Sequence, residues 1–392
     1  MVAAIMLARS LTPQDFARYS YFQLTVSMIG AYAALGLGTT ASRYFAEVGH
    51  EGDAHASRPV GTLLSLSIIV SAAVGGLVLL LPEAVLIGEL AMPSWLLAAG
   101  VVATALGVVP GGAILGLERY KIATLMSIGY GALILASAIV AGRYQAPTLA
   151  MGALVICALL HAVGQFLIAA RVVGWQCMIS GFFFRKQQVL DVTNIAGPLF
   201  LITLISASGS WIVGRILLDS DNGEKTFALY SIGLQWYSLA LLIPGMISRV
   251  VLPRLIRSRA QGGTSGKVII KTSVLVALGA AILVTGSAVL LGPWLGEIYG
   301  RSYSIDRLYI AAYMAAAAVS APTNTLGNAL HANNAQWLLL LHAAVWLVVL
   351  VTTSLVCVHL GLGEWGGSLA HGAAGLCACF LAYIGCRDKQ LV

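Results

Sequence analysis

The stretch VIIKTSVLVALGAAILVTGSAVLLG, residues 268–292, decides the class of this protein. Its 25 positions hold one charged residue, Lys271. An α-helix rises about 1.5 Å per residue, so the stretch reaches about 37 Å, more than the roughly 30 Å of a bilayer's hydrocarbon core. The stretch is therefore predicted to cross a membrane as a helix.

Ten further stretches have similar length and composition, and the chain opens with eight apolar residues, MVAAIMLA, which are too few to cross. Only 9% of the 392 residues are charged and 59% are hydrophobic, whereas a soluble domain carries about 25% charged residues. The sequence therefore predicts an all-α polytopic membrane protein with about twelve helices, the first incomplete. The complete spans are predicted at 19–42, 60–81, 94–116, 122–141, 148–170, 190–217, 227–251, 268–292, 306–330, 336–358 and 365–386.

The basic residues are distributed unevenly between the two sets of loops. Of the 22 lysines and arginines, 15 lie in or beside the loops that follow even-numbered segments, and 7 lie on the opposite side. The positive-inside rule makes the first set cytoplasmic, so the C-terminus is predicted to be cytoplasmic in a bacterial inner membrane. Basic residues scattered over short loops do not suggest nucleic-acid binding.

The chain contains signs of an internal repeat of six helices. Three matches recur at an offset of 211 residues and at the same point of the predicted topology: Tyr19-Ser20 with Tyr230-Ser231, Arg43 with Arg254, and Leu115-Gly116 with Leu326-Gly327. Because six is even, the two halves share one topology, as in transporters built from parallel repeats. Two six-helix lobes are predicted, at 1–185 and 186–392, with the substrate between them.

Several motifs, in order along nearly the whole chain, resemble those of the bacterial polysaccharide flippases of the multidrug/oligosaccharidyl-lipid/polysaccharide (MOP) exporter superfamily. They are LARSLTPQDFARYS (7–20), GLGTTASRYFAE (36–47), LGLERYK (115–121), ALYSIGLQW (228–236), VVLPRL (250–255) and LGNALHANNAQW (326–337). The resemblance implies two lobes that form a V around a central cavity, as in MATE transporters. It also implies alternating-access transport of oligosaccharide linked to undecaprenyl pyrophosphate, for O-antigen, lipopolysaccharide, capsule or exopolysaccharide assembly. Implied partners are the bilayer, a polysaccharide polymerase with its export machinery, and a coupling cation, H⁺ or Na⁺.

The sequence departs from the family pattern at two places. The family commonly has an acidic residue in segment 7, where this chain has Ser210 in SGSWIVGR. The family also has some 15 more residues before the "LAR" motif. We therefore expect the natural reading frame to extend upstream of Met1.

A diphosphate head group that crosses a bilayer needs fixed positive charge, and the planar guanidinium of arginine donates two hydrogen bonds at once. The candidate substrate-binding residues are Arg9 and Arg215, at the predicted external ends of segments 1 and 7, and Arg43 and Arg249, near the cytoplasmic ends of segments 2 and 8. Related flippases place an arginine where "LAR" gives Arg9. The alternatives are arginines that reach to lipid head groups and positive-inside anchors.

Other polar and kink-forming residues complete the candidates. Asp191 and Asn194, in DVTNIAGP, are candidates for ion coupling or a polar cavity; the alternative is a helix N-cap. Pro244 with Gly245, and Pro322, are hinge candidates because proline frees a carbonyl of the preceding turn. Gly111, Gly112 and Gly116 are expected to permit close helix packing.

The sequence predicts no cofactor and no metal site. Its six cysteines mostly lie in apolar runs and form no C-x-x-C pair. The histidines His161, His331, His342 and His371 are scattered through the spans, and a proton relay is not the favoured interpretation.

Three alternatives to a flippase stay open. A cation-coupled small-molecule exporter of the same superfamily would favour a compact acidic site, yet acidic residues are almost absent from the span interiors. A polysaccharide polymerase or membrane acyltransferase would need a large external loop or a placed catalytic histidine, so the chain is predicted not to be an enzyme. The third alternative is a passive scaffold of a polysaccharide assembly complex.

Overall fold

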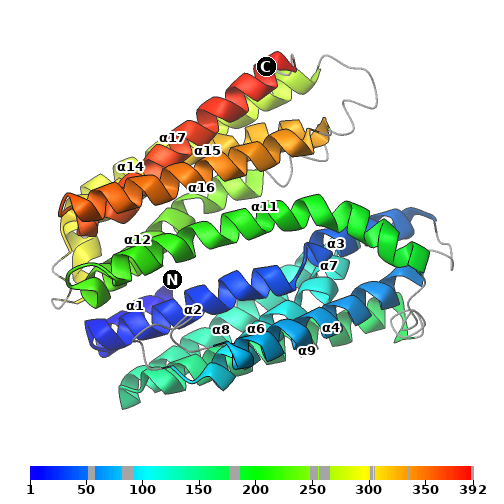
Figure 1. Ribbon diagram of the computed structural model, residues 1–392, viewed down its shortest axis with the longest axis horizontal. Helices are drawn as coiled ribbons and strands as arrows, with labels where there is room; N and C mark the ends of the chain where they lie inside the picture. Colours follow the sequence, from blue (N-terminus) through cyan, green and yellow to red (C-terminus); the bar gives the residue numbers. More distant parts are fainter. Residues whose placement is uncertain are drawn as a thin grey trace. The chain divides into compact units, whose positions relative to one another are not determined.

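A computed structural model describes residues 1–51, 58–81, 92–175, 186–247, 255, 265–300, 303, 305–333 and 335–389 (Figure 1). These residues form helices and no strand. The helices are α1 (Val2–Ser10), α2 (Pro13–Ala33), α3 (Leu37–Glu51), α4 (Arg58–Leu80), α6 (Ser94–Leu106), α7 (Val108–Gly116), α8 (Tyr120–Tyr144), α9 (Pro147–Val173), α11 (Lys186–Leu218), α12 (Gly223–Ala240), α14 (Ser265–Glu297), α15 (Arg307–Ala332), α16 (Gln336–His359) and α17 (Gly363–Asp388).

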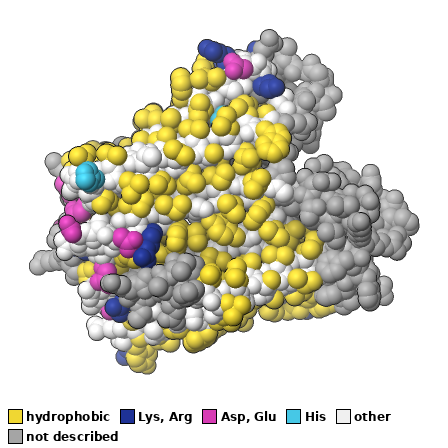
Figure 2. Space-filling view, in the orientation of Figure 1, with side chains coloured by type: hydrophobic (Ala, Val, Ile, Leu, Met, Phe, Trp, Pro, Cys, Tyr) yellow, Lys and Arg dark blue, Asp and Glu magenta, His cyan; other side chains and the backbone are white. Residues whose placement is uncertain are grey.

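The described helices confirm the predicted all-α membrane architecture. Eight helical stretches are long and apolar enough to cross a membrane, and each coincides with a predicted span. The three remaining predicted spans fall on α2 with α3, on α12 and on α15, which are helical but carry more polar residues. On the face shown in Figure 2, hydrophobic side chains cover most of the described surface and charged ones lie toward the helix ends. Leu80 and Leu290, with 83% and 80% of their surface exposed, are suited to contact lipid.

The prediction of one helix over 19–42 is wrong at both ends and in the middle. Helix α2 begins at Pro13, because Thr12 caps it: the Asp15 N–H donates to Thr12 Oγ1 at 3.1 Å, and that hydroxyl donates to the Asp15 carboxylate at 2.8 Å. The helix then ends at Ala33, and α3 starts at Leu37. Leu35 and Gly36, with φ of 47° and 69°, take the left-handed conformation that separates the two helices.

Two further breaks lie three residues before a proline. Helices α6 and α7 are separated at Gly107, three residues before Pro110, and α12 ends at Ala240 with a turn at Leu241, three residues before Pro244. In each case proline supplies no N–H to the carbonyl four residues earlier, which favours a break there. Pro322 behaves differently, because α15 continues through it.

The chain forms two compact units. The N-terminal unit comprises Val2–Leu11 and Arg18–Ala207, and the C-terminal unit comprises Met1, Thr12–Ala17 and Ser208–Val392. The division falls inside α11. The predicted lobe boundary at 185/186 stays a prediction.

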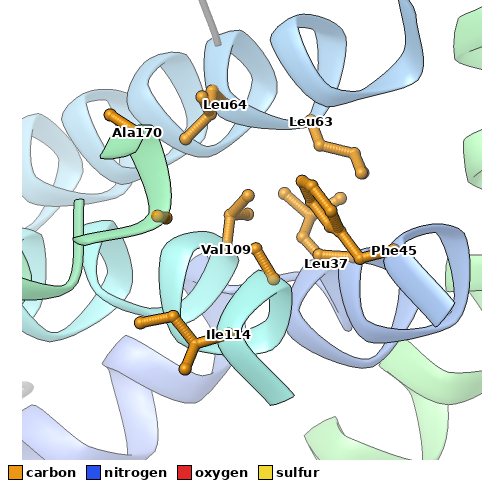
Figure 3. Close-up of a cluster of buried hydrophobic side chains, with 10 residues drawn as sticks. Leu37, Phe45, Leu63, Leu64, Val109, Ile114 and Ala170 are labelled. Carbon is orange, nitrogen blue, oxygen red and sulfur yellow. The ribbon is translucent and has the colours of Figure 1, made fainter. Parts of the chain in front are cut away.

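The N-terminal unit packs α3 against α7, α4 against α6, and α9 against α6, α7 and α8. Its core, in Figure 3, joins residues of α3, α4, α7 and α9, among them Leu37, Phe45, Leu63, Val109 and Ala170. The α3–α7 contact depends on glycine. A Cβ on Gly112 would overlap the carbonyl of Gly38, and one on Gly116 would overlap the carbonyl of Ser42, which confirms close packing at both positions. Gly111 instead faces the side chain of Gln165.

The C-terminal unit packs α15 against α14, α12 and α17, and α16 against α17. One of its apolar clusters joins α14, α15 and α17 through Ile270, Leu326, Leu330, Ala382 and Cys386. Helix α17 is rich in glycine, and its neighbours approach closely there: a Cβ on Gly367 would overlap Tyr313 and Tyr230. This close approach brings a set of polar side chains together inside the unit.

Candidate functional site

Arg215, a predicted substrate-binding residue, lies in the last turn of α11 in the C-terminal unit. Its side chain is 30% exposed, and Nε donates to Oδ2 of Asp219 at 3.0 Å. Its Nη1 is buried and has no hydrogen-bond partner among the described residues. The position near the C-terminus of a helix favours a cation. The guanidinium is therefore partly exposed, has one buried donor that is unpaired among the described residues, and has part of its charge offset by Asp219.

The other three candidate arginines are described only in part. Arg9 lies in the last turn of α1, in the N-terminal unit, and is exposed. Arg43 lies in α3, but its side chain is outside the described part of the chain, and Arg249 is outside it entirely. Arg9 and Arg215 belong to different units. Their role in substrate binding stays a prediction.

Asp191 and Asn194 lie within α11, and their side chains are outside the described residues. The alternative of an N-cap at Asp191 is wrong, because α11 begins five residues earlier, at Lys186. Lys186, Gln187 and Gln188 are good helix formers, so the helix extends beyond the apolar stretch from which its start was predicted. A coupling or cavity role for Asp191 and Asn194 stays a prediction.

The hinge candidates differ in their surroundings. Pro244 is buried and follows the break in helical structure at Leu241, while a Cβ on Gly245 would meet no atom within 4 Å. The chain remains hydrogen-bonded across this break, since Leu241 N–H donates to Tyr237 O and Gly245 N–H donates to Leu241 O. Pro322 is buried inside the continuous helix α15. The geometry at Pro244 is suited to bending; movement at either site stays a prediction.

A polar cluster that the sequence interpretation missed surrounds His371 of α17 in the C-terminal unit. His371 is 1% exposed, and its ring centroid lies 4.8 Å from that of Tyr237, 6.2 Å from that of Tyr230 and 6.3 Å from that of Trp346. Tyr230 and Tyr237 come from α12, and Trp346 comes from α16. The sequence interpretation did not favour a role for His371, but the histidine lies within hydrogen-bonding distance of Tyr230.

Two hydrogen-bonded chains run through this cluster. The Tyr230 hydroxyl lies 3.0 Å from the carbonyl oxygen of Ser210 and 3.4 Å from Nε2 of His371. The Tyr237 hydroxyl donates to Ser320 Oγ at 3.1 Å, and Ser320 donates to the carbonyl of Ala316 at 2.9 Å. Nδ1 of His371 has no hydrogen-bond partner among the described residues. The cluster therefore holds an unsatisfied imidazole nitrogen inside a membrane-spanning helix bundle.

The N-terminal unit has a related but different arrangement around His161 of α9. The Tyr130 ring of α8 lies 4.7 Å from the His161 ring, and Nε2 of Gln165 lies 2.9 Å from Nε2 of His161. His161 precedes His371 by 210 residues, one less than the repeat offset. This spacing places the two histidines at nearly equivalent points of the predicted repeat. The sequence interpretation did not use it.

Comparisons with known proteins identify relatives of similar sequence and solved structures of similar fold. The chain is 25% identical over 390 residues to "EPS I polysaccharide export inner membrane protein EpsE" of Ralstonia solanacearum, covering 96% of this chain and 87% of the relative. The protein of the same name from Ralstonia nicotianae is 24% identical, covering 95% and 86%. No family model matches the chain.

Among solved structures, the fold matches an inward-facing multidrug resistance MATE family transporter of the MOP superfamily with a TM-score of 0.76 and 16% identity, over all of this chain and 94% of that one. The chain has the MOP superfamily fold. A MOP superfamily transporter from Pyrococcus furiosus matches it with a TM-score of 0.73 and 15% identity, over 99% and 91% of the two chains. With the MOP fold, its membrane-spanning helices and these relatives, the protein is a multi-pass inner membrane transporter.

Proposed function

We propose that this MOP-fold transporter moves oligosaccharide linked to undecaprenyl pyrophosphate across the inner membrane by alternating access, for the assembly of an exported polysaccharide. The observation that carries the proposal is the similarity, over 96% of the chain, to relatives named as polysaccharide export proteins. The likeness to multidrug MATE transporters concerns the fold alone, so it does not favour a drug exporter over a flippase.

The chemistry of Arg215 supports a diphosphate substrate. A flippase breaks no bond, but it must give a doubly charged head group a favourable path through the bilayer. Arg215 offers a permanently charged guanidinium whose side chain is 30% exposed and is held only by a weak ion pair to Asp219. In this proposal the diphosphate takes the place of the Asp219 carboxylate beside the guanidinium. Arg9 is a separate candidate for the external stage, and Arg43 and Arg249 are candidates for the cytoplasmic stage.

A deletion strain complemented with variants tests this function. Deleting the gene is expected to abolish exported polysaccharide, with lipid-linked repeat units accumulating on the cytoplasmic side. Arg215→Ala and Arg215→Lys are both expected to restore export poorly, because lysine keeps the charge and loses the two-pronged geometry. Arg143→Ala is the matched control, because Arg143 is an exposed arginine in the last turn of α8 on the same predicted side.

Each result has a direct meaning. Normal export by Arg215→Ala, at membrane levels equal to those of the unaltered chain, would exclude Arg215 from the substrate path. Unchanged polysaccharide in the deletion strain, without accumulation of lipid-linked units, would contradict the proposed function as a whole.

A further inference from the structure

The two ends of the C-terminal unit differ in charge. Residues 208–392 contain seven acidic residues, and six of them lie toward the end where the α11–α12 turn meets the start of α17. They are Asp219, Asp221, Glu224, Glu297, Asp306 and Glu364. The cations here whose side chains are described are both paired, Arg215 with Asp219 and Lys225 with Glu364. This end of the unit is therefore acidic overall.

The opposite end of the unit is basic. Lys267 and Lys271 lie in the first two turns of α14, and Arg387 and Lys389 lie at the end of α17; all four are exposed. The acidic residue among the described groups of this end is Asp388, whose Oδ1 lies 3.9 Å from Nε of Arg387. An ion pair this long and this exposed contributes little. Figure 2 shows dark-blue side chains at this end, beside the C-terminus marked in Figure 1.

Packing between helices brings these basic residues together. Ile270, which lies between Lys267 and Lys271, is 3% exposed and belongs to the same apolar cluster as Cys386, the neighbour of Arg387 in sequence. The start of α14 and the end of α17 are therefore parts of one packed end. We call Lys267, Lys271, Arg387 and Lys389 the basic patch.

An exposed apolar face of α14 continues from the basic patch into the membrane. Val268, Leu275 and Ile282 are 67%, 59% and 64% exposed, and they recur every seven positions on the face that also carries Lys271. From Lys271 to Leu283, which is 73% exposed, the helix rises about 18 Å. One leaflet contributes about 15 Å to the hydrocarbon core. The face therefore spans the depth of one leaflet below the basic patch.

We propose that the basic patch and this face of α14 bind an anionic phospholipid of the bilayer, with its phosphate at the basic patch and an acyl chain along α14. Charge complementarity selects this occupant. A phosphatidylglycerol head group is an anion whose oxygens accept hydrogen bonds from ammonium and guanidinium groups. A lipid without net charge, or an apolar helix of another protein, would cover α14 and leave the basic patch uncompensated.

The positive-inside rule alone explains only part of this arrangement. The rule concerns how many basic residues lie on each side of the membrane, and it does not require them to converge or to lack acidic partners. At the opposite end of the same unit, Lys225 lies 3.9 Å from Glu364. At the basic patch, Lys267, Lys271 and Lys389 form no ion pair with a described residue. An anion supplied by the bilayer accounts for this difference.

Trp337 of α16 reports on this surface. It is 78% exposed, and its neighbour Leu338 approaches α17 so closely that a Cβ on Gly385 would overlap it. Bromine atoms on an acyl chain quench tryptophan fluorescence on contact. The purified full chain is placed in phosphatidylcholine nanodiscs that contain a fixed minor fraction of brominated phosphatidylglycerol or, separately, of brominated phosphatidylcholine. The difference between the unaltered chain and Trp337→Phe isolates the emission of Trp337.

Brominated phosphatidylglycerol is expected to quench Trp337 at least about 2-fold more than brominated phosphatidylcholine does, because each basic residue near the surface favours anionic lipid about 5-fold. Neutralising the start of α14, with Lys267→Gln and Lys271→Gln combined, is expected to remove most of this excess. Added salt is expected to reduce it, since salt screens exposed charges. Lys225→Gln is the matched control, because it neutralises an exposed lysine at the other end of the unit, and it is expected to keep the excess.

Four results would overturn the proposal. Equal quenching by the two brominated lipids in the unaltered chain would show that the basic patch only sets the orientation. An undiminished excess in the Lys267→Gln, Lys271→Gln variant would place the lipid elsewhere. Release of the brominated lipid by glycerol 3-phosphate at constant ionic strength would indicate a site for free phosphate. Release by a trace of undecaprenyl pyrophosphate would assign the surface to the transport substrate. None of these measurements requires transport, so the proposed function is tested separately.

Discussion

Nε of Arg215 lies 3.0 Å from Oδ2 of Asp219, one helical turn further along the chain. The two side chains are 30% and 57% exposed, so the pair contributes at most about 1 kcal/mol to stability. A weak pair of this kind can be exchanged for another anion at little cost. Asp219 therefore competes with any phosphate that approaches Arg215.

Asp219→Asn is expected to strengthen the binding of inorganic pyrophosphate, because it removes the competing carboxylate and leaves the Arg215 charge uncompensated. The expected gain is about 2- to 10-fold, the equivalent of roughly 0.4–1.4 kcal/mol. Calorimetry at low ionic strength on the purified chain measures it. Asp221→Asn, an equal change of charge at an exposed residue two positions on, is expected to have a smaller effect. Equal binding by both variants would show that Asp219 does not control access to Arg215.

The orientation in the membrane can be tested at two exposed ends of the C-terminal unit. Nζ of Lys225 lies 3.9 Å from Oε1 of Glu364, so the α11–α12 turn and the start of α17 lie at the same end of this unit. The positive-inside rule makes that end external. A membrane-impermeant maleimide added to spheroplasts is expected to label Ser220→Cys and to label Lys389→Cys only after lysis. The unaltered chain, in which Cys157, Cys357 and Cys386 are buried, measures the background. The reverse labelling pattern would show that the protein has the opposite orientation in the membrane.

Gly112→Ala is expected to destabilise the N-terminal unit, because the new Cβ would overlap the carbonyl of Gly38. This carbonyl belongs to the backbone of α3 and cannot rotate away as a side chain could. Overpacking of this kind costs about 1–3 kcal/mol. Gly152→Ala in α9 is the control, since its Cβ would meet no atom within 4 Å and alanine favours a helix. Unfolding in a denaturing detergent should separate the two variants, and equal midpoints would argue against the close contact of α3 with α7.

The hydrogen bond from Tyr237 to Ser320 is expected to couple α12 to α15 energetically. Hydrogen bonds between membrane helices contribute about 0.6 kcal/mol on average and reach about 1.7 kcal/mol. A double-mutant cycle of Tyr237→Phe and Ser320→Ala, followed by unfolding in detergent, measures the coupling. Phenylalanine keeps the ring against His371, so the cycle isolates the hydroxyl. Strictly additive effects of the two substitutions would mean that the bond contributes nothing.

The sequence by itself determined the membrane spans, because hydropathy sums over neighbours along the chain and a helix in lipid satisfies its own backbone hydrogen bonds. Local chemistry also determined features that we misjudged: the cap at Thr12, the left-handed Gly36 and the earlier start of α11 at Lys186. The Arg215–Asp219 pair is equally local, because residues four apart share one helix face. These features are properties of short segments, so the sequence alone carries the information that specifies them.

Only the tertiary structure decided which helix faces meet. Tyr230 and His371 are 141 positions apart, and no periodicity indicates that the hydroxyl of one lies 3.4 Å from Nε2 of the other. A histidine on an apolar helix looks the same in sequence whether a donor satisfies it, as Gln165 does for His161, or no described group does, as at Nδ1 of His371. Small residues of α17 contribute to the difference, because Gly367 lets Tyr230 of α12 and Tyr313 of α15 approach that helix closely. Such contacts depend on shape complementarity between distant segments, which composition and spacing along one chain do not specify.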